Sequence, residues 1–126
     1  MKGLKELIQE KLKVSKKQNT YTLFPETKDE LREMIEREIK KNGNNCSLNH
    51  IDVRAITDMS FLFNRSRFNG DIFYWDVSGV ENMKFMFCDS KFNQDISNWE
   101  INSNCETENM FAGCEINPKY KPKDVN

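Results

Sequence analysis

The fold of this chain is decided by a stretch at residues 72–87, which reads IFYWDVSGVENMKFMF. The same pattern of apolar and polar residues occurs 24 positions earlier, at residues 48–63, and 24 positions later, at residues 96–111. One asparagine position recurs at this spacing in four places, at Asn45, Asn69, Asn93 and Asn117. A repeat of this length predicts stacked units that bury their apolar faces against one another, with the asparagines forming a ladder that satisfies loop backbone groups.

Each repeat predicts one short strand and one short helix. From Ile72 to Val77, apolar residues surround a single acidic residue, as in a short half-buried strand. Asn82 then precedes apolar residues spaced i, i+3 and i+4, a pattern typical of a short helix with one buried stripe. We therefore predict an α/β solenoid of two to three coils, built from short parallel strands and short helices.

Residues 45–117 resemble the BspA-like leucine-rich-repeat proteins of bacteria. The similarity lies in three blocks that occur in order, FNQDI at residues 92–96, WDVS at residues 75–78 and NMKFMF at residues 82–87. The resemblance implies a right-handed leucine-rich-repeat solenoid that binds proteins or surface ligands without enzymatic activity. This chain departs from the family in having little more than two full repeats and no export signal, and its third unit carries Asn104 and Thr107 at apolar positions.

The flanking segments predict caps for the two ends of the stack. Residues 1–44 should form an N-terminal helical cap, with a basic amphipathic helix at about residues 2–14 and a second helix at about residues 28–41. Residues 45–117 form the repeat domain, and residues 118–126 should be an irregular tail.

Composition limits the classes of function. The chain has 126 residues, of which 37% are hydrophobic and 31% charged, so we expect one domain with an economical core. No apolar run approaches the ~20 residues of a membrane span, which predicts a cytoplasmic monomer with no membrane contact. The four cysteines form no Cys-x-x-Cys pair, so we expect neither a zinc site nor a disulfide scaffold, and no metal or cofactor.

Three aromatic residues break the register of the repeat and are the preferred contact residues, namely Phe73, Tyr74 and Phe85. Aromatics that repeat in register should form the core, whereas those that do not are more often exposed, and exposed aromatics anchor interfaces. The in-register set expected in the core is Phe63, Phe68, Trp75, Phe87, Phe92, Trp99 and Phe111.

Carboxylates also recur, and Asp52, Asp76 and Glu100 are predicted to form an acidic ladder on the outer face. Two interpretations are open: a docking face for a partner with a basic or mixed surface, or side chains that bond to turn backbones. The first predicted helix is basic, and Lys11 and Lys13 are candidates for contact with RNA or an acidic protein.

The sequence favours a non-enzymatic protein–protein interaction module. One version is a phage or mobile-element inhibitor of a host defence protein, similar in role to anti-CRISPR proteins. Two other binding roles stay open: a nucleic-acid-contacting accessory protein that uses the basic helix, and a fragment of a bacterial surface adhesin. An enzyme or metal protein would have to use Cys46 and His50, a Cys-x-x-x-His pair whose histidine occupies a variable repeat position.

Overall fold

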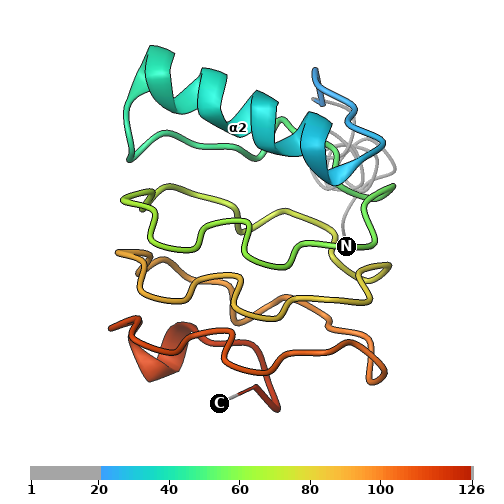
Figure 1. Cartoon of the computed structure of the whole chain (residues 1–126), viewed down its shortest axis with the longest axis vertical. Coiled ribbons are helices and arrows are strands. Elements are labelled where there is room, and N and C mark those ends of the chain that lie inside the picture. Colours follow the sequence, from blue (N-terminus) through green and yellow to red (C-terminus); the bar gives the residue numbers. More distant parts are fainter. Residues whose placement is uncertain (1–20, 126) are drawn as a thin grey trace, which may run out of the picture.

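The computed structural model describes residues 21–125, which form a stack of coils with one helix across the end of the stack (Figure 1). We number the coils by the repeat: the first is residues 45–68, the second 69–92 and the third 93–116. The described elements are the α-helix α2, Lys28–Asn42, and the 3-10 helix η1, Pro118–Tyr120. Between residues 21 and 125 there is no β-strand, only isolated parallel bridges, which pair Leu23 with Ile51, Asp58 with Asn82 and Asn82 with Glu106.

Helix α2 has the start and stop signals that its sequence carries. The hydroxyl oxygen of Thr27 accepts a hydrogen bond from the backbone N–H of Glu30 at 3.2 Å, which caps the first turn. Gly43 ends the helix with a left-handed φ of 88°, and its N–H donates to the carbonyl of Ile39 at 2.7 Å. Leu31 and Ile35 are buried, so one face of α2 belongs to the core.

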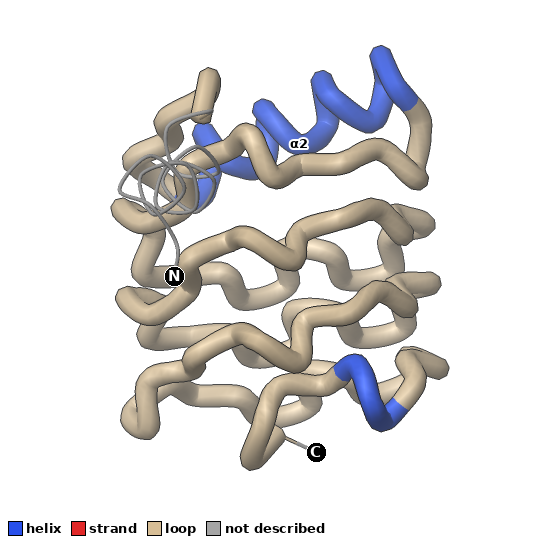
Figure 2. The backbone as a smooth tube through the Cα atoms, turned by 180° about the vertical axis from the view of Figure 1, so that it is seen from behind, coloured by secondary structure: helices blue, strands red, loops and turns tan. Residues whose placement is uncertain are grey.

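Each coil is a succession of tight turns. In the second coil, five backbone N–H groups donate to the carbonyl three residues earlier at 3.0–3.2 Å, those of Trp75, Val80, Met86, Cys88 and Ser90. Short polar side chains start several of these turns: Asp71 accepts from the N–H of Phe73 at 2.9 Å, and Asp76 accepts from the N–H of Ser78 at 3.1 Å. The chain therefore changes direction every few residues, and Figure 2 shows the coils as continuous loops.

Neighbouring coils are joined by backbone hydrogen bonds. Four N–H groups at alternate residues of the first coil donate to carbonyls of the second at 2.8–3.0 Å, those of Met59, Phe61, Phe63 and Arg65 to Asn82, Lys84, Met86 and Cys88. Three members of the predicted asparagine ladder are confirmed: the N–H of Asn93 donates to the side-chain oxygen of Asn69 at 2.7 Å, and the N–H of Asn117 donates to that of Asn93 at 2.8 Å. Asn45 does not join it, because the N–H of Asn69 donates to the backbone carbonyl of Asn44 at 2.7 Å.

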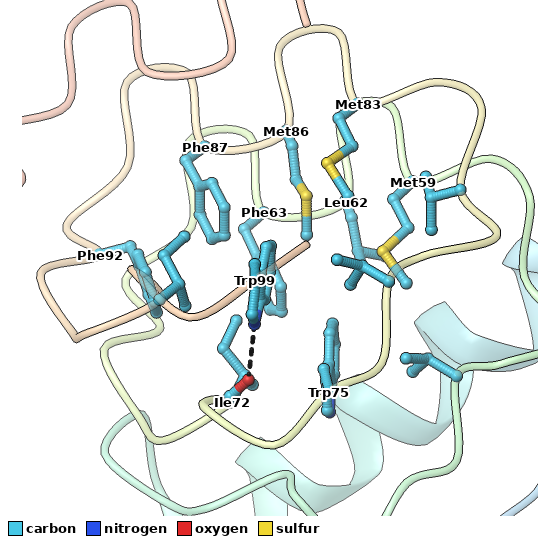
Figure 3. Close-up of a cluster of buried hydrophobic side chains, with 14 of the residues drawn as sticks. Met59, Leu62, Phe63, Ile72, Trp75, Met83, Met86, Phe87, Phe92 and Trp99 are labelled. Carbon is cyan, nitrogen blue, oxygen red and sulfur yellow. Dashed lines mark hydrogen bonds between the residues drawn. The ribbon is translucent and has the colours of Figure 1, made fainter. Parts of the chain in front are cut away.

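The core is made of in-register side chains stacked from coil to coil (Figure 3). Phe63, Phe87 and Phe111 form a column in which neighbouring ring centroids lie 5.5 Å apart. Trp75 stacks on Trp99 with a centroid distance of 6.4 Å. The indole N–H of Trp99 donates to the carbonyl of Ile72 at 3.2 Å. All seven in-register aromatics predicted to be core are buried, which confirms that prediction.

The prediction of an α/β leucine-rich-repeat solenoid with short strands and helices is wrong. The segment expected to be a strand bends at a turn, because the N–H of Trp75 bonds to the carbonyl of Ile72 within the same coil. The segment expected to be a helix is interrupted at Phe85, whose left-handed φ of 57° no α-helix accommodates. Successive β-turns place apolar residues three apart, much as a helix does, so the sequence pattern did not separate the two.

The remaining expectations concern the two ends. The helix expected at about residues 2–14 lies outside the described residues, whereas α2 covers the segment expected to be helical at 28–41. Residues 118–120, in the tail expected to be irregular, form η1. Within residues 21–125, no helix is long and apolar enough to cross a membrane.

The stacked core predicts the cost of removing one ring. Replacing Trp99, which is only 4% exposed, with alanine should lower the free energy of unfolding by about 3–5 kcal/mol, because the cavity between coils cannot close without breaking the backbone bonds. Trp99→Phe, which keeps a ring but loses the bond to Ile72, should cost less. Urea unfolding followed by circular dichroism measures both; a loss below about 0.5 kcal/mol for Trp99→Ala would contradict the stacking.

Candidate functional site

The most unusual surface feature is a pair of stacked phenylalanines, Phe61 and Phe85. Their ring centroids lie 4.9 Å apart and the planes are nearly parallel, at 9°. Phe61 is 48% exposed and Phe85 is half-buried. We call this pair the aromatic stack.

Both phenylalanines have a backbone conformation that disfavours them. Their φ angles are 59° and 57°, in the left-handed region that bulky side chains rarely adopt. The equivalent residue of the third coil is Asn109, with a φ of 56°, and asparagine tolerates this region. The backbone of the coil therefore requires the left-handed turn but not the phenylalanine, and a strained residue of this kind points to a role outside the fold.

A groove borders the aromatic stack. It has a volume of about 260 Å³ and runs between α2 and residues 61–66. Its apolar lining comes from both sides and consists of Ile35, Ile39, Phe61, Leu62 and Phe63. Arg32 and Glu36 of α2 place charges of both signs at the same groove.

The three predicted contact aromatics do not form one cluster. Phe73 and Tyr74 touch edge to face, with centroids 5.0 Å apart, and Tyr74 is 42% exposed. Phe85 instead stacks on Phe61 of the neighbouring coil. Sequence reasoning missed Phe61, although it occupies the same repeat position as Phe85; the signal that selects Phe85, the polar third copy Asn109, applies equally to Phe61.

Two of the three carboxylates of the predicted acidic ladder are engaged in hydrogen bonds within their own coil. Asp52 binds Arg54 through two side-chain bonds of 2.9 and 2.8 Å, and this hydrogen bonding holds the pKa of Asp52 below its usual value. Asp76 accepts from the hydroxyl of Ser78 at 2.7 Å, as expected if the carboxylate stabilises its own turn. Glu100 is exposed.

Part of this ladder nevertheless borders a hollow between the second and third coils. The hollow measures about 260 Å³, and its lining includes the predicted contact residues Tyr74, Asp76 and Glu100. The structure thus brings three of the predicted residues together on one face. The two basic candidates, Lys11 and Lys13, lie outside the described residues.

Cys46 and His50 serve to hold α2 on the first coil. The ring Nε2 of His50 pairs with the carboxylate of Glu38, and the thiol of Cys46 donates to the carbonyl oxygen of Glu38 at 3.9 Å. Burial, together with the negative charge of Glu38, raises the pKa of Cys46, so its thiol stays protonated at neutral pH. No hydrogen bond joins Cys46 to His50, and among residues 21–125 no three His, Cys, Asp or Glu side chains are placed to hold a metal ion.

These features define a class: a helix-capped stack of 24-residue turn coils with an exposed aromatic pair. The chain belongs to the family described as Mycoplasma protein of unknown function, DUF285, whose model matches residues 29–121. This match corrects the resemblance to BspA-like leucine-rich-repeat proteins, which is not the family found. No curated protein and no solved structure matches the chain.

The geometry of the aromatic stack predicts an unusual stability result. Replacing both Phe61 and Phe85 with asparagine should change the free energy of unfolding by less than about 1 kcal/mol, because relief of the left-handed strain offsets the lost ring contact. Phe63→Ala, which empties the core one turn away, should cost about 3–5 kcal/mol. Urea unfolding compares the variants, and a loss above about 2 kcal/mol for the double variant would mean that the stack is structural.

Proposed function

We propose that this chain is a non-enzymatic protein-binding module that contacts its partner through the aromatic stack and the adjoining groove. The observation that carries the proposal is the exposed Phe61 on Phe85, held in left-handed backbone where the third coil has Asn109. Residues that strain the fold and expose apolar area persist where a partner covers them.

The chemistry of the groove indicates what the partner presents. Aromatic residues dominate the energy of protein interfaces because they bury large rigid areas at a low entropic cost. An apolar side chain of the partner would enter beside Phe61, while Arg32 and Glu36 would meet polar groups at the rim. The partner therefore carries an apolar anchor within a surface of mixed charge.

The state of the cysteines supports a cytoplasmic site of action within the same proposal. Cys46, Cys88, Cys105 and Cys114 are all free. Disulfides are rare in the reducing cytosol and common in oxidising compartments, so four unpaired cysteines fit a cytoplasmic protein. The thiol of Cys46 has a raised pKa and makes no bond to His50, so these two residues do not form the nucleophile and base that a cysteine enzyme would need.

Binding tests the proposal directly. The immobilised chain should capture a protein from its native cells, and the purified partner should then lose at least about tenfold in affinity for the Phe61→Asn/Phe85→Asn variant. The matched control is Phe24→Asn, which removes an aromatic that is 59% exposed but lies outside the repeat. Isothermal titration measures each affinity.

The binding measurements distinguish the aromatic stack from the hollow lined by Tyr74. Loss confined to the double variant supports the aromatic stack, whereas equal binding by all forms would place the contact elsewhere. Loss in Tyr74→Asn alone would assign binding to the hollow that Tyr74 lines. The identity of the captured protein tests the narrower prediction that the partner is a host defence protein.

The acidic residues should affect the rate of binding more than its strength. Neutralising Asp76 and Glu100 together, as Asp76→Asn/Glu100→Gln, should slow association severalfold at low salt and leave dissociation nearly unchanged, because exposed charges steer encounter. Stopped-flow association at several salt concentrations measures this effect. An unchanged association rate would show that the partner does not approach this face.

A further inference from the structure

Along one segment of each coil, the backbone bonds at alternate residues run from the earlier coil to the later one. The second coil repeats the pattern of the first: N–H groups of four alternate residues donate to carbonyls of the third coil at 2.7–3.1 Å, those of Met83, Phe85, Phe87 and Asp89 to Glu106, Glu108, Met110 and Ala112. At these four positions the earlier coil supplies the N–H groups and the later coil the carbonyls, while elsewhere Glu81, Lys91 and Glu106 donate back to the preceding coil.

The four equivalent N–H groups of the third coil have no following coil to bond to. They belong to Thr107, Asn109, Phe111 and Gly113, and none has an acceptor among residues 21–125. The carbonyls of Thr107, Asn109 and Phe111 already accept bonds within their own turns, from Met110, Ala112 and Cys114. We call these four N–H groups the donor row, because this edge offers donors and no free carbonyl at those three positions.

The chain after the third coil covers a different part of that coil. The carbonyl of Tyr120 accepts from the N–H of Ile96 at 3.0 Å, so η1 lies beneath the start of the coil, and Figure 2 shows it at that end of the stack. The ring beside the donor row is already covered: Phe111 is only 6% exposed, and the ammonium of Lys121 lies 5.3 Å from its ring centroid. Asn109 and Gly113 are exposed.

We propose that the donor row binds a segment of a partner protein, which adds to the stack as a further rung. Its backbone carbonyls at four alternate residues accept the bonds, and an apolar side chain replaces Lys121 on the ring of Phe111. The geometry is the one already formed twice within this chain, where Phe63, Phe87 and Phe111 stack at 5.5 Å between bonded rungs. Unpaired N–H groups in a regular row are a known template for such addition.

A second copy of this chain does not fit the donor row. It would have to offer carbonyls of residues 58–64 in its first coil, and α2 lies across that end of the stack (Figure 1). There Lys28 of α2 donates to the hydroxyl of Ser60 at 2.8 Å and pairs with Asp58 at 3.7 Å. Two donor rows cannot bond to each other, so the occupant is a different chain.

Amide hydrogen exchange by NMR on the full chain tests this inference. The probe is a blocked synthetic peptide with the sequence of residues 104–114, both cysteines replaced by serine, since this segment supplies the carbonyls bonded by the second coil. Without peptide, the amides of the donor row should exchange at least about 100-fold faster than those of Phe85, Phe87 and Asp89, which are the matched internal control. Millimolar peptide should slow exchange in the donor row saturably and leave the control amides unchanged.

Two controls make the result decisive. A scrambled peptide should have no effect, and Lys121→Ala should bind the peptide equally or more tightly, because the displaced side chain is gone. No protection at millimolar peptide, equal protection by the scrambled peptide, or loss of binding in Lys121→Ala would overturn the proposal; the last result would mean that peptide carboxylates are recognised instead. Protection that appears without peptide and grows with protein concentration would identify a second copy as the occupant and would also overturn it.

Discussion

Backbone hydrogen bonding between successive coils is the interaction on which the rest of this structure depends. The repeats contain neither strands nor α-helices, so their buried N–H and C=O groups must be satisfied by turns within a coil and by bonds to the next. Because the four interlocking N–H groups fall on alternate residues at a fixed offset, the repeat length cannot vary by even one residue without losing the register. The strict spacing of 24 in the sequence is the visible result.

This constraint also fixes where the backbone must be left-handed. Positive φ recurs at two positions of each coil, Phe61, Phe85 and Asn109 at the first, and Arg65, Asp89 and Gly113 at the second. At Gly113 two features disfavour a side chain: φ is 71°, and a methyl group on the Cα atom would overlap the carboxylate of Asp89. Phe61 and Phe85 occupy a position where the third coil has asparagine, so their backbone strain serves something other than folding. This difference separates the aromatic stack from the buried aromatic core.

The sequence is enough to predict which side chains are buried but not the backbone that carries them. Period alone places Phe63, Phe87 and Trp99 in the core, because identical positions of stacked coils must meet. It does not separate a run of β-turns from a short helix, since both space apolar residues three apart, and the left-handed φ of Phe85 has no signature in its residue type.

The candidate site was predictable to a similar degree. Tyr74, Asp76 and Glu100 share one hollow because they belong to neighbouring positions of stacked coils, which the repeat implies. Asp52 is bound to Arg54, a pairing that depends on a residue unique to the first coil. Phe61 should have been predicted together with Phe85, because both occupy a repeat position whose third copy, Asn109, is polar.

A stack of coils offers two kinds of surface for recognition, and they obey different rules. Side chains in a column such as His50, Tyr74 and Asn98 differ from coil to coil, so a column can vary to suit a partner even where one member makes a contact of its own, as the amide of Asn98 does to the carbonyl of Phe73 at 3.1 Å. The ends of the stack cannot change in this way, because what they present is the backbone itself. Helix α2 covers the carbonyl end, while η1 covers only part of the other. Specificity by side chain therefore belongs to the columns, whereas the N–H end can recognise only a chain whose backbone continues the same pattern.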